Sequence, residues 1–105
     1  MSVDRTHRLL ARALAKRFAP LASDVASVSI TPWESATFSG ARHQWAVTVV
    51  GDGAWPAAKA FSRTLAEAEF DLPGNIVADI AVTALDRADP QTVSLKVEAL
   101  TVGCA

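Results

Sequence analysis

The chain has 105 residues, of which 50% are hydrophobic and 20% are charged, and this composition excludes a disordered polypeptide. Its net charge of −1 argues against a general attraction to nucleic acid or to anionic membranes. The one cysteine, Cys104, has no partner for an internal disulfide and agrees with a reducing compartment. We see neither a signal segment nor a membrane span, so we expect a cytoplasmic protein folded as one domain.

The first predicted element is a helix over residues 4–18. Leu10, Leu14 and Phe18 recur at intervals of four residues and mark one apolar face, and Pro20 ends the pattern. Alanine, leucine and arginine dominate this segment, and all three are good helix formers. A second face of the helix is basic and carries Arg5, Arg8, Arg12 and Lys16.

Two strands are predicted next, over residues 25–31 and 41–50. In both, apolar side chains recur at every second position, which is typical of a strand with one buried face, and Pro32 is expected to close the first. The side chains predicted to face the core are Ala26, Val28, Ile30, Trp45, Val47 and Val49. Those predicted to face outward from the first strand are Ser27, Ser29 and Thr31.

The segment that leads into the second strand contains a further prediction. Phe38 and Trp45 are separated by an odd number of positions, so a regular strand would place them on opposite faces. An extra residue at Ser39–Gly40 would bring both to one face, and glycine permits such a bulge. We therefore expect a kinked strand here, with His43 in the phase of Trp45 and Arg42 on the opposite face.

The second half of the chain repeats the pattern of the first. A helix is predicted from Pro56 to about Phe70, because proline suits the first turn of a helix, where its missing N–H has no helical partner. Alternation then predicts strands over residues 76–83 and 93–100. The polar residues 86–91 between them are expected to form a loop.

The predicted order is therefore αββαββ, in two αββ halves of about residues 1–52 and 53–105, whose patterns align at a fixed offset. Two helices would cover one face of a four-stranded antiparallel sheet, giving an α+β two-layer sandwich. A right-handed crossover between the halves gives the strand order 3-4-2-1. That topology resembles a circularly permuted ferredoxin-like fold, a resemblance of topology and not of motifs.

No motif for a cofactor or a metal is present. The chain lacks GxxxxGK[ST], GxGxxG, HExxH, GxSxG and CxxC. His7, His43 and Cys104 are the strong ligand types for soft metals, and the strand order allows His43 and Cys104 to lie near each other but leaves open whether they do. Nothing in the pattern places His7 with them, so we predict no metal site and no cofactor.

The function favoured by these features is a non-enzymatic module that self-associates, as a homodimer, or binds a protein partner. One face of the predicted sheet is left without helices, and its polar and charged side chains form the predicted interaction face: Arg42, Gln44, Asp79, Lys96 and Glu98.

Two alternatives stay open. The first is a small-molecule-binding or catalytic domain with a pocket near Trp33, His43 and Trp45. The second and weaker alternative is nucleic-acid binding through the basic face of the first helix, which the slightly negative net charge disfavours.

Overall fold

A computed structural model describes residues 3–103 and places two helices and four strands within them, in the predicted αββαββ order. The elements are α1 (Val3–Lys16), β1 (Ala22–Glu34), β2 (Ser39–Val50), α2 (Ala54–Thr64) with the short 3₁₀ turn η1 (Leu65–Glu67), β3 (Asn75–Asp89) and β4 (Thr92–Gly103). The strands form one antiparallel sheet in the order β1-β2-β4-β3. This is the predicted order counted from the opposite edge, so the α+β class and the permuted ferredoxin-like topology are confirmed.

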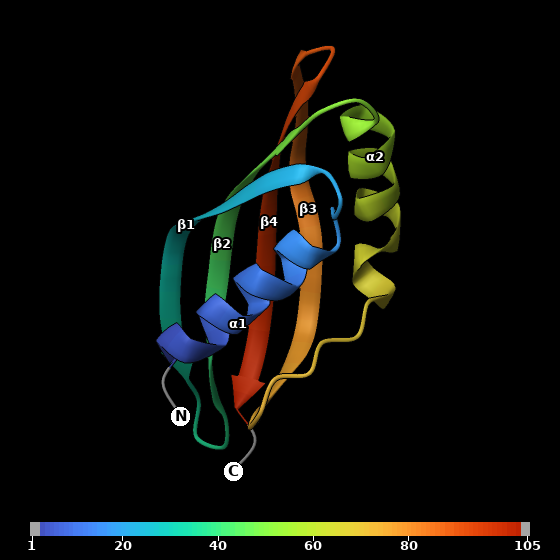
Figure 1. The fold of residues 1–105 in the computed structure, drawn as a ribbon. Coiled ribbons are helices and arrows are strands. Elements are labelled where there is room, and N and C mark those ends of the chain that lie inside the picture. Colours follow the sequence, from blue (N-terminus) through green and yellow to red (C-terminus); the bar gives the residue numbers. More distant parts are fainter. Residues whose placement is uncertain (1–2, 104–105) are drawn as a thin grey trace.

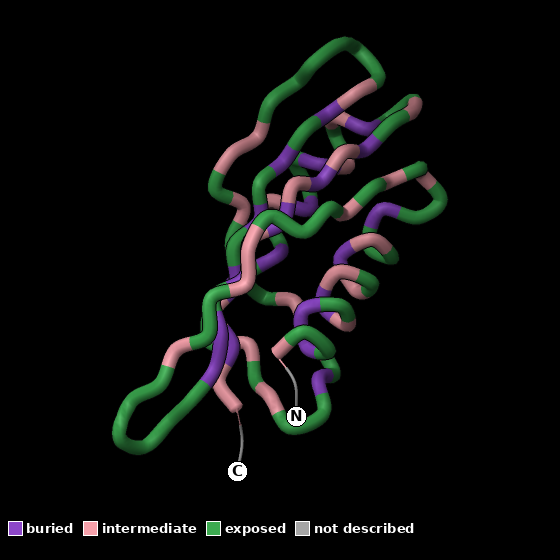
Figure 2. The backbone as a smooth tube through the Cα atoms, turned by 90° about the vertical axis from the view of Figure 1, so that its left-hand side faces the viewer, coloured by how far each residue is buried: buried purple, intermediate pink, exposed green. Residues whose placement is uncertain are grey.

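The molecule has two layers, with both helices on one face of the sheet (Figure 1). α1 packs mainly on β1 and β2, whereas α2 packs mainly on β4 and β3. Figure 2 shows buried segments on the helices and on the strands that they cover. The largest fully buried side chains include Trp45, Leu10, Leu14, Leu65 and Leu95. The opposite face of the sheet carries no helix among residues 3–103, and we call it the open face.

The first helix forms as its apolar spacing predicts. Leu10 and Leu14 are fully buried and Phe18 is 3% exposed, so the stripe that they form faces the sheet. Phe18 also packs on Phe61 of α2, with the ring centroids 4.5 Å apart. The four basic residues of the helix are all exposed: Arg5, Arg8, Arg12 and Lys16.

The second helix is shorter than predicted. It begins after the N-cap residue Gly53, which has a φ of 84°, in the left-handed region that glycine readily adopts. Pro56 lies in the first turn, as expected. The prediction that it continues to about Phe70 is wrong, because the α-helix ends at Thr64 and η1 follows. The Thr64 hydroxyl donates to the Ala60 carbonyl, 2.9 Å away, a local side-chain bond that often accompanies bent or frayed helix ends.

All four strands are longer than predicted, β1 and β3 by the most. Pro32 does not close the first strand, since β1 continues to Glu34 and Pro32 pairs with Ala41. Because β1 lies at the edge of the sheet, half of its N–H groups face away from β2, and a proline is tolerated there. The loop predicted over residues 86–91 is too long, because β3 extends to Asp89 and only the tight turn at residues 90–91 precedes β4.

The bulge predicted at Ser39–Gly40 is wrong as well. The β1–β2 register is continuous there, and Phe38 lies in the preceding turn with 56% of its surface exposed. The irregularity lies instead in β1, between Ser27 and Ser29, and it leaves Val28 unpaired and 58% exposed. As a result Ser27 pairs with Trp45 on the helix side of the sheet and does not face outward.

Candidate functional site

Two histidines meet in the interior, between α1 and the sheet. His7 Nδ1 on α1 lies 2.8 Å from His43 Nδ1 on β2. His7 Nε2 lies 2.9 Å from Ser27 Oγ on β1, and His43 Nε2 lies 2.9 Å from Thr101 Oγ1 on β4. The pair therefore connects the helix to three strands through four polar side chains. A neighbouring bond, from Asn75 Nδ2 to Thr6 Oγ1 at 3.1 Å, adds β3 to the set.

The partners favour one direction for the protons. The Thr101 hydroxyl lies 3.4 Å from the Ala41 carbonyl, to which it can donate if it accepts from His43 Nε2–H. His43 Nδ1 is then unprotonated and accepts from His7 Nδ1–H, and His7 Nε2 accepts from the Ser27 hydroxyl. The reverse direction would turn the Thr101 proton toward His43 and away from the Ala41 carbonyl. The first assignment forms all four hydrogen bonds, from Ser27 through the two histidines and Thr101 to the Ala41 carbonyl, and it requires both rings to be neutral.

Burial keeps both rings neutral. His7 is 4% exposed and His43 is fully buried. Burial, and after it the charge of a protonated His7, lowers the pKa of His43 from 6.5 to about 4. Burial also lowers the pKa of His7, an effect that the Asp4 carboxylate partly opposes. The hydrogen-bonded pair is therefore uncharged at pH 7.

Trp45 stacks on both imidazoles. Its ring centroid lies 4.7 Å from that of His7 and 5.4 Å from that of His43. The predicted pocket residues His43 and Trp45 are thus neighbours, but they belong to packed core. Trp33 lies apart from them, against Gly40, and lines a different hollow that also includes Val3.

The period-two pattern of β2 predicts His43 on the core side of the sheet, but no pattern in the sequence brought His7 to it. His7 lies three residues before Leu10, so it belongs to the same helical stripe as the buried leucines. A histidine in the core-facing phase of a helix, with a second in the core-facing phase of a strand, is the signal that predicts such a pair. Cys104, considered above beside His43, lies outside the described residues.

The arrangement has a chemical limit. Ser27, His7 and His43 have the connectivity of a nucleophile, its base and a third group that orients the base. In such arrays the third group is usually a carboxylate, which stabilises the imidazolium that forms. His43 is neutral and has a lowered pKa, so it can orient His7 but cannot offset its charge. Among residues 3–103, no group of three or more histidine, cysteine or acidic residues could hold a metal ion.

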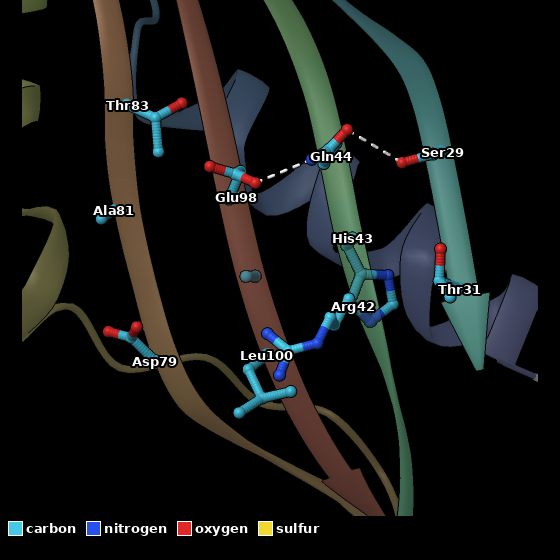
Figure 3. A pocket seen from close by; sticks show the side chains of 11 residues that line it. Ser29, Thr31, Arg42, His43, Gln44, Asp79, Ala81, Thr83, Glu98 and Leu100 are labelled. Atoms are coloured by element: carbon cyan, nitrogen blue, oxygen red, sulfur yellow. Dashed lines mark hydrogen bonds between the residues drawn. The ribbon is translucent and has the colours of Figure 1, made fainter. Parts of the chain in front are cut away.

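A second polar region lies on the open face, at the middle of the sheet (Figure 3). Gln44 Oε1 accepts from Ser29 Oγ at 3.0 Å, and Gln44 Nε2 donates to Glu98 Oε1 at 2.7 Å. The Arg42 side chain extends over β4 beside Leu100 (Figure 3). These groups border a shallow hollow of about 260 Å³, which Asp79 also lines. Of the predicted interaction residues, Arg42, Gln44, Asp79 and Glu98 lie together here, and Lys96 lies one step further along β4.

Comparison with known proteins gives one informative similarity. The chain is similar in structure to a chain of the virion of a native gene transfer agent (GTA) particle, with a TM-score of 0.62 and 18% sequence identity. The alignment covers 97% of this chain and 92% of that chain, so the likeness extends over the whole fold. No protein-family model and no curated protein matches the sequence. At this identity the similarity shows a shared fold.

No helix among the described residues is long and apolar enough to cross a membrane. The cytoplasmic location stays a prediction.

Proposed function

We propose that this chain is a non-enzymatic structural subunit that self-associates and packs with other proteins in a multi-protein particle. The observation that carries the proposal is the likeness, over nearly the full length of both chains, to a component of a virion particle. The protein interior agrees with this role, because the buried histidines are used in hydrogen bonds between elements.

The open face is the surface that we propose for contact. Both edge strands are interrupted, β1 by the bulge at Val28 and by Pro32, and β3 by three register shifts. Such interruptions hinder edge-to-edge pairing of sheets. The open face instead offers small and polar side chains, and its central strands β2 and β4 pair without a register shift, which lets a second surface approach closely.

The charges of the open face suit a second copy of the same chain. Its central part carries two cations, Arg42 and Lys96, and two carboxylates, Asp79 and Glu98. Lys96 and Glu98 are two residues apart on β4 and so point to the same side. If the β4 strands of two copies stack in opposite directions, each Lys96 comes opposite the Glu98 of the other copy.

A charge exchange tests the proposal. We expect the wild-type chain to self-associate in sedimentation velocity. Either Lys96→Glu or Glu98→Lys alone should raise the dissociation constant of the self-associated form by about tenfold, because like charges would then face each other. The double variant Lys96→Glu/Glu98→Lys should regain association. Arg63→Glu, an equal charge change at an exposed position of α2, is the matched control. A wild-type chain that stays monomeric at every concentration would contradict self-association, and insensitivity to all three changes would exclude this face.

A further inference from the structure

We propose that the hydrogen bond between His7 and His43 is an acid-sensitive latch that holds the first turns of α1 on the sheet. The latch consists of this bond together with the hydrogen bonds of the two rings to Ser27 and Thr101. This proposal goes beyond the structural role proposed above, and it does not depend on whether the chain self-associates.

The latch is well placed to control the start of the helix. From Leu9 onward, α1 is held by apolar side chains that pack in or against the core, Leu9, Leu10 and Leu14, and Phe18 adds to them just beyond the end of the helix. Before Leu9, the buried side chains are Thr6 and His7, and both are held by polar bonds to the sheet. The attachment of residues 3–8 therefore depends on the hydrogen-bonding state of these groups.

Protonation changes that state in two steps. With one added proton, one ring still has an unprotonated Nδ1, so the Nδ1–Nδ1 bond survives as a charge-assisted bond, while the Ser27 hydroxyl turns to accept. With a second proton, both Nδ1 atoms, 2.8 Å apart, are donors and neither can accept. Two like charges then face each other in a buried site, and the simplest relief is for His7 to leave with the turn that carries it.

The charged surroundings of the pair are one-sided. Among the described residues, Asp4 is the acid whose charge acts on His7, and it lies on the same turn of α1. The groups that bond the pair from the strands are the hydroxyls of Ser27 on β1 and Thr101 on β4. Arg42, the neighbour of His43 on β2, lies on the open face. No carboxylate on the strands bonds the pair within residues 3–103, so the sheet offers no counter-charge that would hold a doubly protonated pair in place.

The first test is amide hydrogen exchange of the wild-type chain at about pH 7.5 and about pH 4.5, corrected for the intrinsic effect of pH on exchange. We expect exchange at residues 5–9 to rise by about tenfold or more relative to β4 amides when the pH is lowered. Equal protection of these residues at both pH values would overturn the proposal.

The variant for this test is His7→Leu/His43→Leu, which replaces the pair by apolar side chains. In this variant, the exchange rate at residues 5–9 relative to that of the β4 amides should not depend on pH. An equal acid response in this variant would overturn the proposal.

A second measurement keeps the test valid if the double variant does not fold. Nitrogen chemical shifts of the wild-type imidazoles report tautomer and charge directly. We expect His7 protonated at Nδ1 and His43 protonated at Nε2 at pH 7, with both rings titrating only below their ordinary range and the uptake of the second proton coinciding with the loosening of α1. A ring already charged at pH 7, or a second proton taken up while α1 stays protected, would overturn the proposal.

Discussion

At the scale of single residues, His43 links the stability of the fold to pH. In the folded state its pKa is about 4, against 6.5 ordinarily, so between these values the unfolded chain binds the proton that the folded chain excludes. The contribution of a neutral His43 to the stability of the fold is therefore fully present above about pH 6.5 and is lost as the pH falls toward 4. His7, whose pKa is also lowered, acts in the same direction.

We expect the free energy of unfolding to be constant from pH 8 to about 6.5 and to fall by about 3 kcal/mol by pH 4 from His43 alone. Urea denaturation at a series of pH values measures this loss. His43→Gln, which cannot take up a proton, should be less stable at pH 7 but should lose less stability in acid. A wild-type curve that is flat down to pH 4 would contradict a neutral buried pair.

The sequence predicts half of this site. The period-two pattern of β2 places His43 with Trp45 under the helices, which the structure bears out by burying both. The contact with His7 was not predicted, because it depends on where along β2 the helix lies, and no local pattern records that distance. Ser27 was assigned to the wrong face for a related reason, since a strand bulge inverts the alternation beyond it.

At the scale of elements, the regular segments were predicted and the irregular ones were not. α1, β2 and β4 combine a long apolar period with good propensity, so pattern and structure agree. Pro32 and the polar residues of β3 carry local signals for a break, and strand pairing overrides both. Pairing with β4 extends β3 as far as Asp89, and the Arg87 guanidinium there lies 5.5 Å from the Trp55 ring centre.

At Gly40, the close pairing of β2 with β4 leaves no room for a side chain. A Cβ there would collide with the Thr101 carbonyl and press on the Trp33 ring. We expect Gly40→Ala to destabilise the fold by about 2 kcal/mol or more, because β2 and β4 would have to separate at this point. Gly53→Asn is the control, since Gly53 has open space around it and asparagine tolerates its positive φ. Thermal unfolding that ranks the two variants equally would contradict this role of Gly40.

At the scale of the whole molecule, the two edges of the sheet decide how copies can meet. The molecule is elongated, with principal extents of 48 × 20 × 20 Å, and its edge strands β1 and β3 run over 13 and 15 residues, so each edge would present many free backbone groups if it were regular. The bulge at Val28 and the proline at position 32 interrupt β1, and three shifts interrupt β3. That the halves 1–52 and 53–105 are copies of one unit stays a prediction.

Removing the interruptions of β1 should change association more than folding. Deleting Val28 leaves the pairs on either side, Ser27 with Trp45 and Ser29 with Gln44, in consecutive register. Combined with Pro32→Thr, this gives a continuous edge, and we expect faster aggregation by light scattering with a melting temperature changed by only a few degrees. Pro73→Thr, outside the strands, is the control for loss of a proline. Unchanged aggregation would show that the interruptions do not protect this edge.

The strand order also sets the order of events by which the chain folds. Each hairpin, β1 with β2 and β3 with β4, joins neighbours across a short turn and closes at little entropic cost. The central pairing of β2 with β4 is different, because even its nearest partners, Val50 and Thr92, have all of α2 and β3 between them. We therefore expect the long-range pairing of β2 with β4, in which Trp45 meets Val97, to limit the rate of folding.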